Sequence, residues 1–122
     1  MKLQSHALTH LNTFTGYGDD FVMINAQRHT GSMLVMPERM APWRPDSFDA
    51  LQAEDFAELI AFKPELVLLA TGSQQRFPHP RLTSALMQAQ IGLDAMNLGA
   101  ACRTYNILMS EGRQVLLAVL YK

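Results

Sequence analysis

The chain has 122 residues, of which 48% are hydrophobic and 17% are charged, and its formal net charge is −1 at pH 7. This composition excludes a disordered chain, and the length suits a single domain spanning residues 1–122. The lysine and arginine residues, ten in all, form no dense run, which argues against nucleic-acid binding. No window approaches the ~20 apolar residues of a membrane span.

The cysteine content and the N-terminus predict where the protein is located. Cys102 is the single cysteine, which excludes a disulfide within the chain and suits a reducing compartment. Residues 1–6 lack the long apolar core of a signal peptide. We therefore expect a soluble protein of the cytoplasm.

The N-terminal third predicts an antiparallel β-hairpin. Residues 16–20 are typical of a turn, and the apolar residues 21–25 then predict a strand. Residues 29–36 predict a second strand, with Gln27 and Arg28 as the turn between the two. Gly31 and Ser32 interrupt this second strand, so we expect a bulge or a close approach of backbone there.

A segment rich in proline follows the hairpin. Pro37, Pro42 and Pro45 surround Trp43, and a stretch with this many prolines is neither a helix nor a central strand. Trp43 is our candidate for contact with a partner protein, because exposed aromatic side chains are common at interfaces. The alternative is that Trp43 is a plug over the sheet.

The C-terminal half predicts alternating helices and strands. The expected helices cover residues 53–62, 80–91 and 98–111, and the expected strands cover residues 66–70, 93–96 and 115–121. Two of these strands, 66–70 and 115–121, are apolar without alternation, which indicates central strands buried on both faces. The order of the elements predicts an α/β domain whose helices cover an inner sheet.

The loop after the strand at 66–70 is the first candidate site. Thr71, Gly72, Ser73 and Arg76 offer hydroxyls, backbone N–H groups and a guanidinium, which are suitable ligands for an anion. The strands at 66–70 and 93–96 are joined by one helix, so we expect them to be parallel neighbours. Their carboxyl ends would then place this loop beside the N-terminus of the helix at 98–111. The alternative is a plain connection in which Gly72 serves backbone geometry.

The helix at 98–111 carries the second candidate. Arg103, Asn106, Ser110 and Arg113 are spaced three, four and three residues apart, so they lie on one side of the helix. We include Arg103 and Asn106 among the candidate ligands, and Arg103 reaches the crevice only if its side chain folds toward the helix N-terminus. The alternative is a solvated helix face with no ligand.

Other kinds of site receive little support. The four histidines show no metal-ligand spacing, so no metal is expected, and His79 beside Pro80 is expected to help begin a helix. Neither a Walker lysine nor a three-glycine dinucleotide pattern is present, so no cofactor is expected. Cys102 is expected to be a packed, inert thiol. No acid–base pair is evident, which argues against an enzyme.

Three segments resemble a known family. Residues 68–72 (LLATG), 96–108 (MNLGAACRTYNIL) and 111–115 (EGRQV) are similar to a widespread family of uncharacterised proteins with an MTH-type domain. The family includes short bacterial proteins, the mitochondrial respiratory complex I assembly factor three and the adipogenesis-associated MTH-domain proteins of animals. The chain departs from the family pattern at Ala70, where glycine is frequent, and at Asn97-Leu98, where a more polar pair is frequent.

The resemblance implies a three-layer α/β fold with a mixed central sheet and a last strand antiparallel to its neighbours. The helix before that strand would by itself favour a parallel one. The family has no established catalytic residues, and its eukaryotic members act as assembly or regulatory partners. We therefore expect a non-enzymatic binding or assembly-type protein that recognises another protein. The alternative is a binder of a small molecule or anion, or an enzyme, that uses the crevice at Thr71, Gly72 and Ser73.

Overall fold

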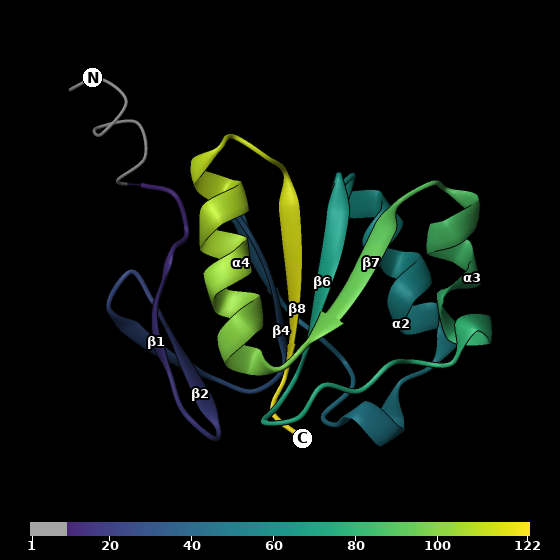
Figure 1. Ribbon diagram of the computed structural model, residues 1–122, viewed down its shortest axis with the longest axis horizontal. Helices are drawn as coiled ribbons and strands as arrows, with labels where there is room; N and C mark the ends of the chain where they lie inside the picture. Colours follow the sequence, from purple (N-terminus) through teal and green to yellow (C-terminus); the bar gives the residue numbers. More distant parts are fainter. Residues whose placement is uncertain (1–9) are drawn as a thin grey trace.

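The computed structural model describes residues 10–122, which form two sheets and three α-helices (Figure 1). The strands are β1 (Phe14–Tyr17), β2 (Phe21–Ile24), β3 (Gln27–Thr30), β4 (Met33–Met36), β5 (Arg39–Pro42), β6 (Leu66–Thr71), β7 (Gly92–Met96) and β8 (Val115–Leu120). The α-helices are α2 (Ala53–Ala57), α3 (Pro80–Gln88) and α4 (Leu98–Ser110), and 3₁₀ turns are η1 (Phe48–Ala50) and η2 (Glu58–Phe62). The prediction about a signal peptide concerns residues 1–6, which lie outside the described residues.

The larger sheet is mixed and has the strand order β5-β4-β8-β6-β7. Both neighbours of β6 run parallel to it, whereas β4 runs antiparallel to β8 and to β5. The expectation that the last strand is antiparallel to its neighbours is therefore wrong for β6 and right for β4. The helix α4 returns the chain from β7 over the sheet to β8, and a crossover of that kind produces a parallel strand.

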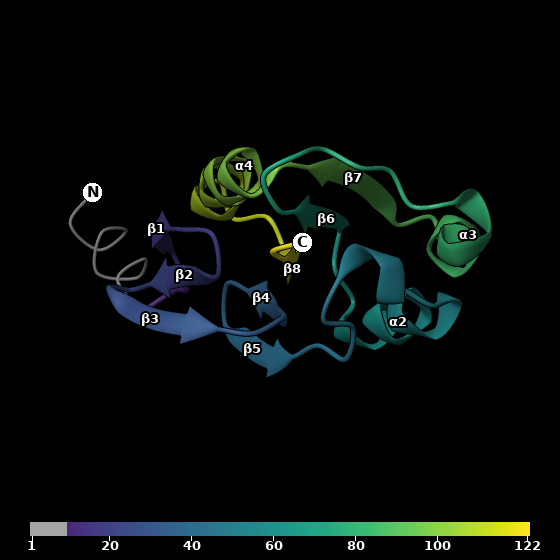
Figure 2. The ribbon, with the colours of Figure 1, turned by 90° about the horizontal axis from the view of Figure 1, so that it is seen from below.

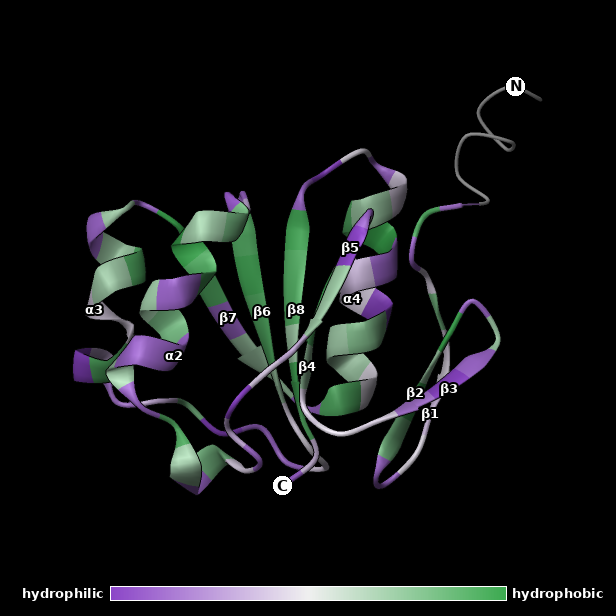
Figure 3. Cartoon of the chain, turned by 180° about the vertical axis from the view of Figure 1, so that it is seen from behind, coloured by the Kyte–Doolittle hydropathy of each residue, from purple (hydrophilic) through white to green (hydrophobic). Residues whose placement is uncertain are grey.

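Both faces of this sheet are covered. Leu68 and Ala70 of β6 pack with α4 and the small N-terminal sheet, whereas Val67 and Leu69 pack with α2 and α3. Figure 2 shows α4 on one face and α2 on the other. Every residue of β8 is buried, and β6 and β8 are the most uniformly hydrophobic strands in Figure 3. The predicted mixed sheet with helices on its faces is confirmed.

The small sheet contains β1, β2 and β3, all antiparallel. The predicted hairpin exists, but its turn is Asn25-Ala26, which have φ values of 51° and 65°, and not Gln27-Arg28. Such a left-handed pair matches the twist of a two-residue hairpin. The predicted second strand at 29–36 is in fact two strands. Gly31, with φ of 83°, passes the chain from β3 in one sheet to β4 in the other.

Two short strands were not predicted. β1 contains Gly16 and Tyr17, which the sequence assigned to a turn, and its pairing with β2 is irregular between Phe14 and Gly16. β5 is an edge strand that ends at Pro42, a position where a missing N–H costs no ladder bond. Neither strand shows the apolar pattern on which strand prediction depends.

The helix boundaries follow their capping residues. The predicted helix at 53–62 ends as an α-helix at Ala57 and continues as the 3₁₀ turn η2, after which Lys63 takes a left-handed φ of 54°. His79 caps α3 as expected, because its Nδ1 accepts a hydrogen bond of 3.1 Å from the N–H of Arg81. That helix ends at Gln88, earlier than predicted, and Gly92 begins β7 instead of ending α3.

Trp43 is the plug over the sheet, the second of the two alternatives. Its side chain is buried, its ring lies edge-on to Phe56 at 6.0 Å, and its indole N–H donates to the carbonyl oxygen of Asp55 at 3.3 Å. In this conformation Trp43 does not present its ring to a partner protein.

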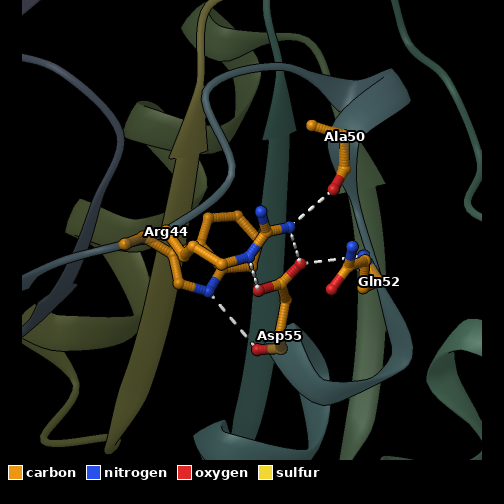
Figure 4. Close-up of polar contacts among 5 residues, drawn as sticks. Arg44, Ala50, Gln52 and Asp55 are labelled. Atoms are coloured by element: carbon orange, nitrogen blue, oxygen red, sulfur yellow. Dashed lines mark hydrogen bonds and ion pairs between the residues drawn. The ribbon is translucent and has the colours of Figure 1, made fainter.

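A polar network around Asp55 fixes the chain beside Trp43 (Figure 4). Arg44 donates to both carboxylate oxygens of Asp55, through Nε at 2.8 Å and Nη2 at 2.7 Å, and the N–H of Gln52 donates to Oδ2 at 2.8 Å. Burial by itself would raise the pKa of Asp55, but the hydrogen bonds from Arg44 and Gln52 and the charge of Arg44 outweigh it. The pKa of Asp55 is therefore lower than its ordinary value of 3.8.

We expect Asp55→Asn to lower the free energy of unfolding at pH 7 by about 1–3 kcal/mol, because it removes hydrogen bonds to a buried charged group. A carboxyl whose pKa is lowered by folding stabilises the protein above its unfolded pKa, and this contribution is lost as the pH falls through the folded pKa. The difference between the parent and Asp55→Asn should thus be complete at neutral pH and disappear below pH 3.8. Urea unfolding at stepped pH measures it.

The control for this prediction is Asp49→Asn. Asp49 also pairs with an arginine, Arg76 at 3.0 Å, but its side chain is 84% exposed. Its replacement should change the free energy of unfolding by less than ~0.5 kcal/mol at any pH. A destabilisation by Asp55→Asn that did not vary with pH would show that the carboxylate charge is not what stabilises the network.

Candidate functional site

A pocket of about 510 Å³ opens at the carboxyl ends of β6 and β7. In Figure 1 the turn between β1 and β2, the loop after β6, the start of α4 and the C-terminus lie at this same end of the molecule. Residues from all four segments line the pocket: Tyr17, Gly18, Asp19, Gly72, Ser73, Asn97, Leu98, Gly99 and Tyr121. Carboxyl ends of parallel strands are where open α/β sheets place their ligands.

The loop after β6 is held against the end of β8 and the start of α4. The N–H of Gly72 donates to the carbonyl oxygen of Leu120 at 3.0 Å, and the carbonyl oxygen of Gly72 accepts from the N–H of Leu98 at 2.7 Å. Gly72 has a φ of 72°, and a Cβ there would overlap the carbonyl oxygen of Tyr121. Glycine is therefore required at this position both for its conformation and for the close approach of the chain end.

The N-terminus of α4 forms one wall of the pocket. Asn97 caps the helix, because its Oδ1 accepts a hydrogen bond of 2.8 Å from the N–H of Ala100. The N–H of Leu98 donates to the carbonyl oxygen of Gly72. Within residues 10–122 the N–H of Gly99 has no hydrogen bond acceptor, so it remains available at the positive end of the helix dipole.

Two side chains converge on Gly99. The hydroxyl of Tyr17 lies against it, and Nη1 of Arg103 lies 3.3 Å from the position that a Cβ of Gly99 would take. The side chain of Arg103 thus folds toward the helix N-terminus, although Arg103 does not itself line the pocket. Tyr17 is 49% exposed, so an aromatic ring stands at the rim of the pocket.

Tyr121 follows β8 and supplies a buried hydroxyl. Its oxygen is inaccessible to solvent and has no hydrogen bond partner in the described part of the chain. Burial raises the pKa of Tyr121 to about 12, with smaller contributions from the Cys102 thiol and from Asp20. The phenol is therefore neutral at physiological pH and can donate a hydrogen bond.

Cys102 is on α4, three residues after Gly99, which lines the pocket. It is buried, as predicted, and burial raises the pKa of its thiol to about 12, although the charge of Arg103 acts in the opposite direction. A neutral buried thiol is a poor nucleophile.

The structure does not bring all the predicted site residues together. Gly72 and Ser73 line the pocket, whereas Thr71 is buried and its hydroxyl donates to the carbonyl oxygen of Gln74 at 2.6 Å. Arg76 points to another part of the surface, where it pairs with Asp49 at 3.0 Å and covers the ring of Phe48. These two side chains organise the loop and its surroundings and do not line the pocket.

Asn106 has a structural contact in place of the predicted ligand. Its Oδ1 accepts from the N–H of Phe14 at 2.9 Å, and its Nδ2 donates to the carbonyl oxygen of Phe14 at 2.8 Å. The hydroxyl of Tyr105, the preceding residue on α4, donates to the carbonyl oxygen of Asn12 at 2.9 Å. Both side chains hold β1 against α4, and they thereby position the turn that carries Tyr17 and Asp19.

Four pocket residues were not predicted as site residues from the sequence, namely Tyr17, Gly18, Asp19 and Tyr121. They come from the two ends of the chain and meet only after the small sheet has packed on α4. The exposed tyrosine in a glycine-flanked turn was the one available signal.

Comparison with known proteins finds a matching family model and several similar chains. A family model described as "Protein of unknown function (DUF498/DUF598)" matches residues 14–120. The assembly factor 3 of the NADH dehydrogenase [ubiquinone] 1 alpha subcomplex from Bos taurus is 24% identical over 115 residues, which is 93% of this chain and 61% of that protein. A protein of Francisella tularensis named "13 kDa major membrane protein" is 30% identical over 70 residues, 57% of each chain.

A solved structure shares the fold. The solution structure of a Bordetella pertussis protein, described as an Mth938-like domain, has a TM-score of 0.77 and 32% identity, and the match covers 92% of this chain and 87% of that one. This chain spans between about half and three fifths of the length of the assembly factors that it matches. Within residues 10–122 every helix is too short or too polar to cross a membrane.

Proposed function

The chain belongs to the DUF498/DUF598 family of Mth938-like proteins, and from this membership we propose that it is a non-enzymatic binding protein of the assembly-factor type. It recognises a protein partner at the pocket lined by Tyr17, Ser73, Gly99 and Tyr121. The distant relation to the complex I assembly factors supports a role in binding another protein.

The rim of the pocket carries this proposal. Tyr17 presents about half of its surface to solvent on a turn that α4 holds in place through Asn106. Tyrosine is enriched at protein interfaces, because it offers a large contact area and a polar tip on one side chain with few rotatable bonds. The pocket of about 510 Å³ beside it is large enough for side chains of a partner segment.

A second candidate is the binding of a small anion in the same pocket. The observation in its favour is that the guanidinium of Arg103 folds back to Gly99, whose N–H has no acceptor within residues 10–122. In this case the ligand is free in solution and no protein partner is needed.

We also propose that the protein works in the cytoplasm. Cys102 is a free, buried thiol, which suits a reducing compartment. Fractionation of cells followed by immunoblotting tests this, and recovery of the chain with the membrane fraction at high salt would contradict it.

Affinity capture with a variant that fills the pocket tests the proposed function. Ser73→Trp places a large ring at the exposed loop that lines the pocket, and Ser84→Trp places the same ring on the exposed face of α3. We expect the parent and Ser84→Trp to capture the same discrete protein from a lysate of the native cell, and Ser73→Trp to lose it. Equal capture by all three proteins would contradict recognition at this pocket.

A further inference from the structure

We propose that residues 76–81 (RFPHPR) form a second interaction surface, a polyproline II ridge that enters an aromatic-lined groove of a partner protein, with a carboxylate at the rim of that groove. None of these residues lines the pocket, so this surface goes beyond the proposed function and does not depend on it. In Figure 1 the ridge is the part of the connection between β6 and α3 that leads into α3.

The backbone of the ridge is extended before any partner binds. Residues 75–79 belong to no helix, strand or turn, and His79 has φ of −60° and ψ of 138°, which are polyproline II angles. The ring of Pro78 fixes its own φ at about −65°. Phe77 and His79 each precede a proline, which keeps them out of the helical region. The ridge thus has the conformation that proline-recognition domains select.

Phe77 and Pro80 form the apolar edge of the ridge. Polyproline II repeats every three residues, so these two side chains lie on the same side of the segment. Both are exposed, and Phe77 has 72% of its surface open to solvent, the largest fraction among the large hydrophobic residues of the described part of the chain. Two apolar side chains at a spacing of three residues are what aromatic-lined grooves accept.

The ridge is held in place at both ends. The guanidinium of Arg76 pairs with Asp49 at 3.0 Å and lies over the ring of Phe48, 4.0 Å from its centre. The N–H of Arg76 also donates to Oγ1 of Thr71 at 3.1 Å. At the other end, His79 caps α3 through its ring nitrogen. A segment fixed in this way loses little conformational entropy when it binds, which favours affinity.

Arg81 gives the ridge a positive charge that the fold does not neutralise. No carboxylate within residues 10–122 lies within 4.0 Å of its guanidinium, whereas Arg76 pairs with Asp49. Arg81 is also the second residue of α3, whose first turn has no acidic residue, and the helix dipole disfavours a cation there. A carboxylate of the partner would offset both effects, so we expect one at the rim of its groove.

The charge of the ridge favours a protein groove over a lipid surface. Attachment to anionic lipids takes clusters of about four to eight lysine or arginine residues. The ridge carries two arginines, and the charge of Arg76 is already balanced by Asp49. One unpaired arginine beside one exposed phenylalanine suits the single carboxylate and the apolar groove of a protein.

Photo-cross-linking in the native cell tests the proposal, with p-benzoylphenylalanine in place of Phe77 in the full chain. This residue keeps the phenyl ring and reacts with protein and lipid alike. We expect one discrete protein adduct whose cross-linked peptide contains tyrosine or tryptophan together with aspartate or glutamate. An adduct with lipid, with a second copy of this chain or with a peptide that lacks those residues would overturn the proposal, and so would the absence of any adduct.

Two charge reversals separate recognition from a structural role. Arg81→Glu places an anion at the N-terminus of α3, so the thermal midpoint should stay the same or rise, whereas the yield of the adduct at position 77 should fall about tenfold. Lys63→Glu makes the same change of charge at an exposed residue after η2 and should leave the yield unchanged. A yield in Arg81→Glu equal to that of the parent, or an equal loss in both variants, would overturn the role of this charge.

Pro80→Ala tests the apolar edge. It removes the ring at the spacing of three from Phe77, and α3 should remain intact because alanine is a good helix former. We expect the yield of the adduct to fall severalfold. A yield equal to that of the parent would contradict recognition of a polyproline II ridge.

Discussion

Leu68→Ala is expected to lower the free energy of unfolding by about 2–5 kcal/mol, because it leaves a cavity in a close-packed core. Leu68 is fully buried in the middle of β6, where it packs in the cluster formed by α4 and the small sheet. The strand has a neighbour on each side and is covered on both faces, so the surrounding residues cannot close the cavity easily. Urea unfolding followed by circular dichroism measures the change.

The control for Leu68→Ala is Ile107→Ala. Ile107 is on α4 with 59% of its surface exposed, and its truncation should cost less than ~0.5 kcal/mol. A midpoint of Leu68→Ala close to that of the parent would show that β6 is not the centre of the core.

Gly72→Ala is expected to cost about 2–4 kcal/mol, from two independent causes. The φ of 72° is unfavourable for a residue with a Cβ, which accounts for about 1–2 kcal/mol. The new Cβ would also overlap the carbonyl oxygen of Tyr121 and lie 3.3 Å from the N atom of Lys122. Because these are backbone atoms, the chain end has to move away from the loop, at a cost similar to that of overpacking.

Gly31→Ala separates the two causes. Gly31 has a φ of 83°, but a Cβ there would meet no atom within 4 Å. This variant should therefore lose only the conformational part, about 1–2 kcal/mol. Equal losses in Gly72→Ala and Gly31→Ala, measured by urea unfolding, would contradict the close approach of the chain end to the loop.

The centre of the fold could be predicted from the sequence, because long apolar runs leave few alternatives. β6 and β8 are apolar at every position but Thr71, so they had to be buried on both faces. The helices between the strands were predicted from the spacing of their apolar residues and from the glycine and proline residues at their ends. The pairing of β6 with β7 followed from the single helix between them.

The edges of the fold could not be predicted, because their contacts are made by backbone and polar groups. β1 buries only Phe14 and is otherwise held by its pairing with β2 and by the amide of Asn106, so no periodicity marks it. The passage from β3 to β4 at Gly31 divides what looked like one strand between two sheets.

The candidate site was predicted in part for the same reason. Gly72 and Ser73 were predicted as site residues because they are in the loop that follows a buried strand. Thr71 and Asn106 are polar residues in suggestive places, but their hydrogen bonds go to main-chain atoms of the protein. In a sequence a side chain that pairs with backbone cannot be told from one that awaits a ligand.

Site-specific photo-cross-linking in the native cell tests most directly that the pocket recognises a protein partner. A photoreactive side chain at position 73 is at the pocket, and the same group in place of Met87, which is 67% exposed on α3, is the control. The proposal predicts one discrete cross-linked protein for position 73 that is absent for position 87. No adduct at position 73, or the same adducts at both positions, would contradict it.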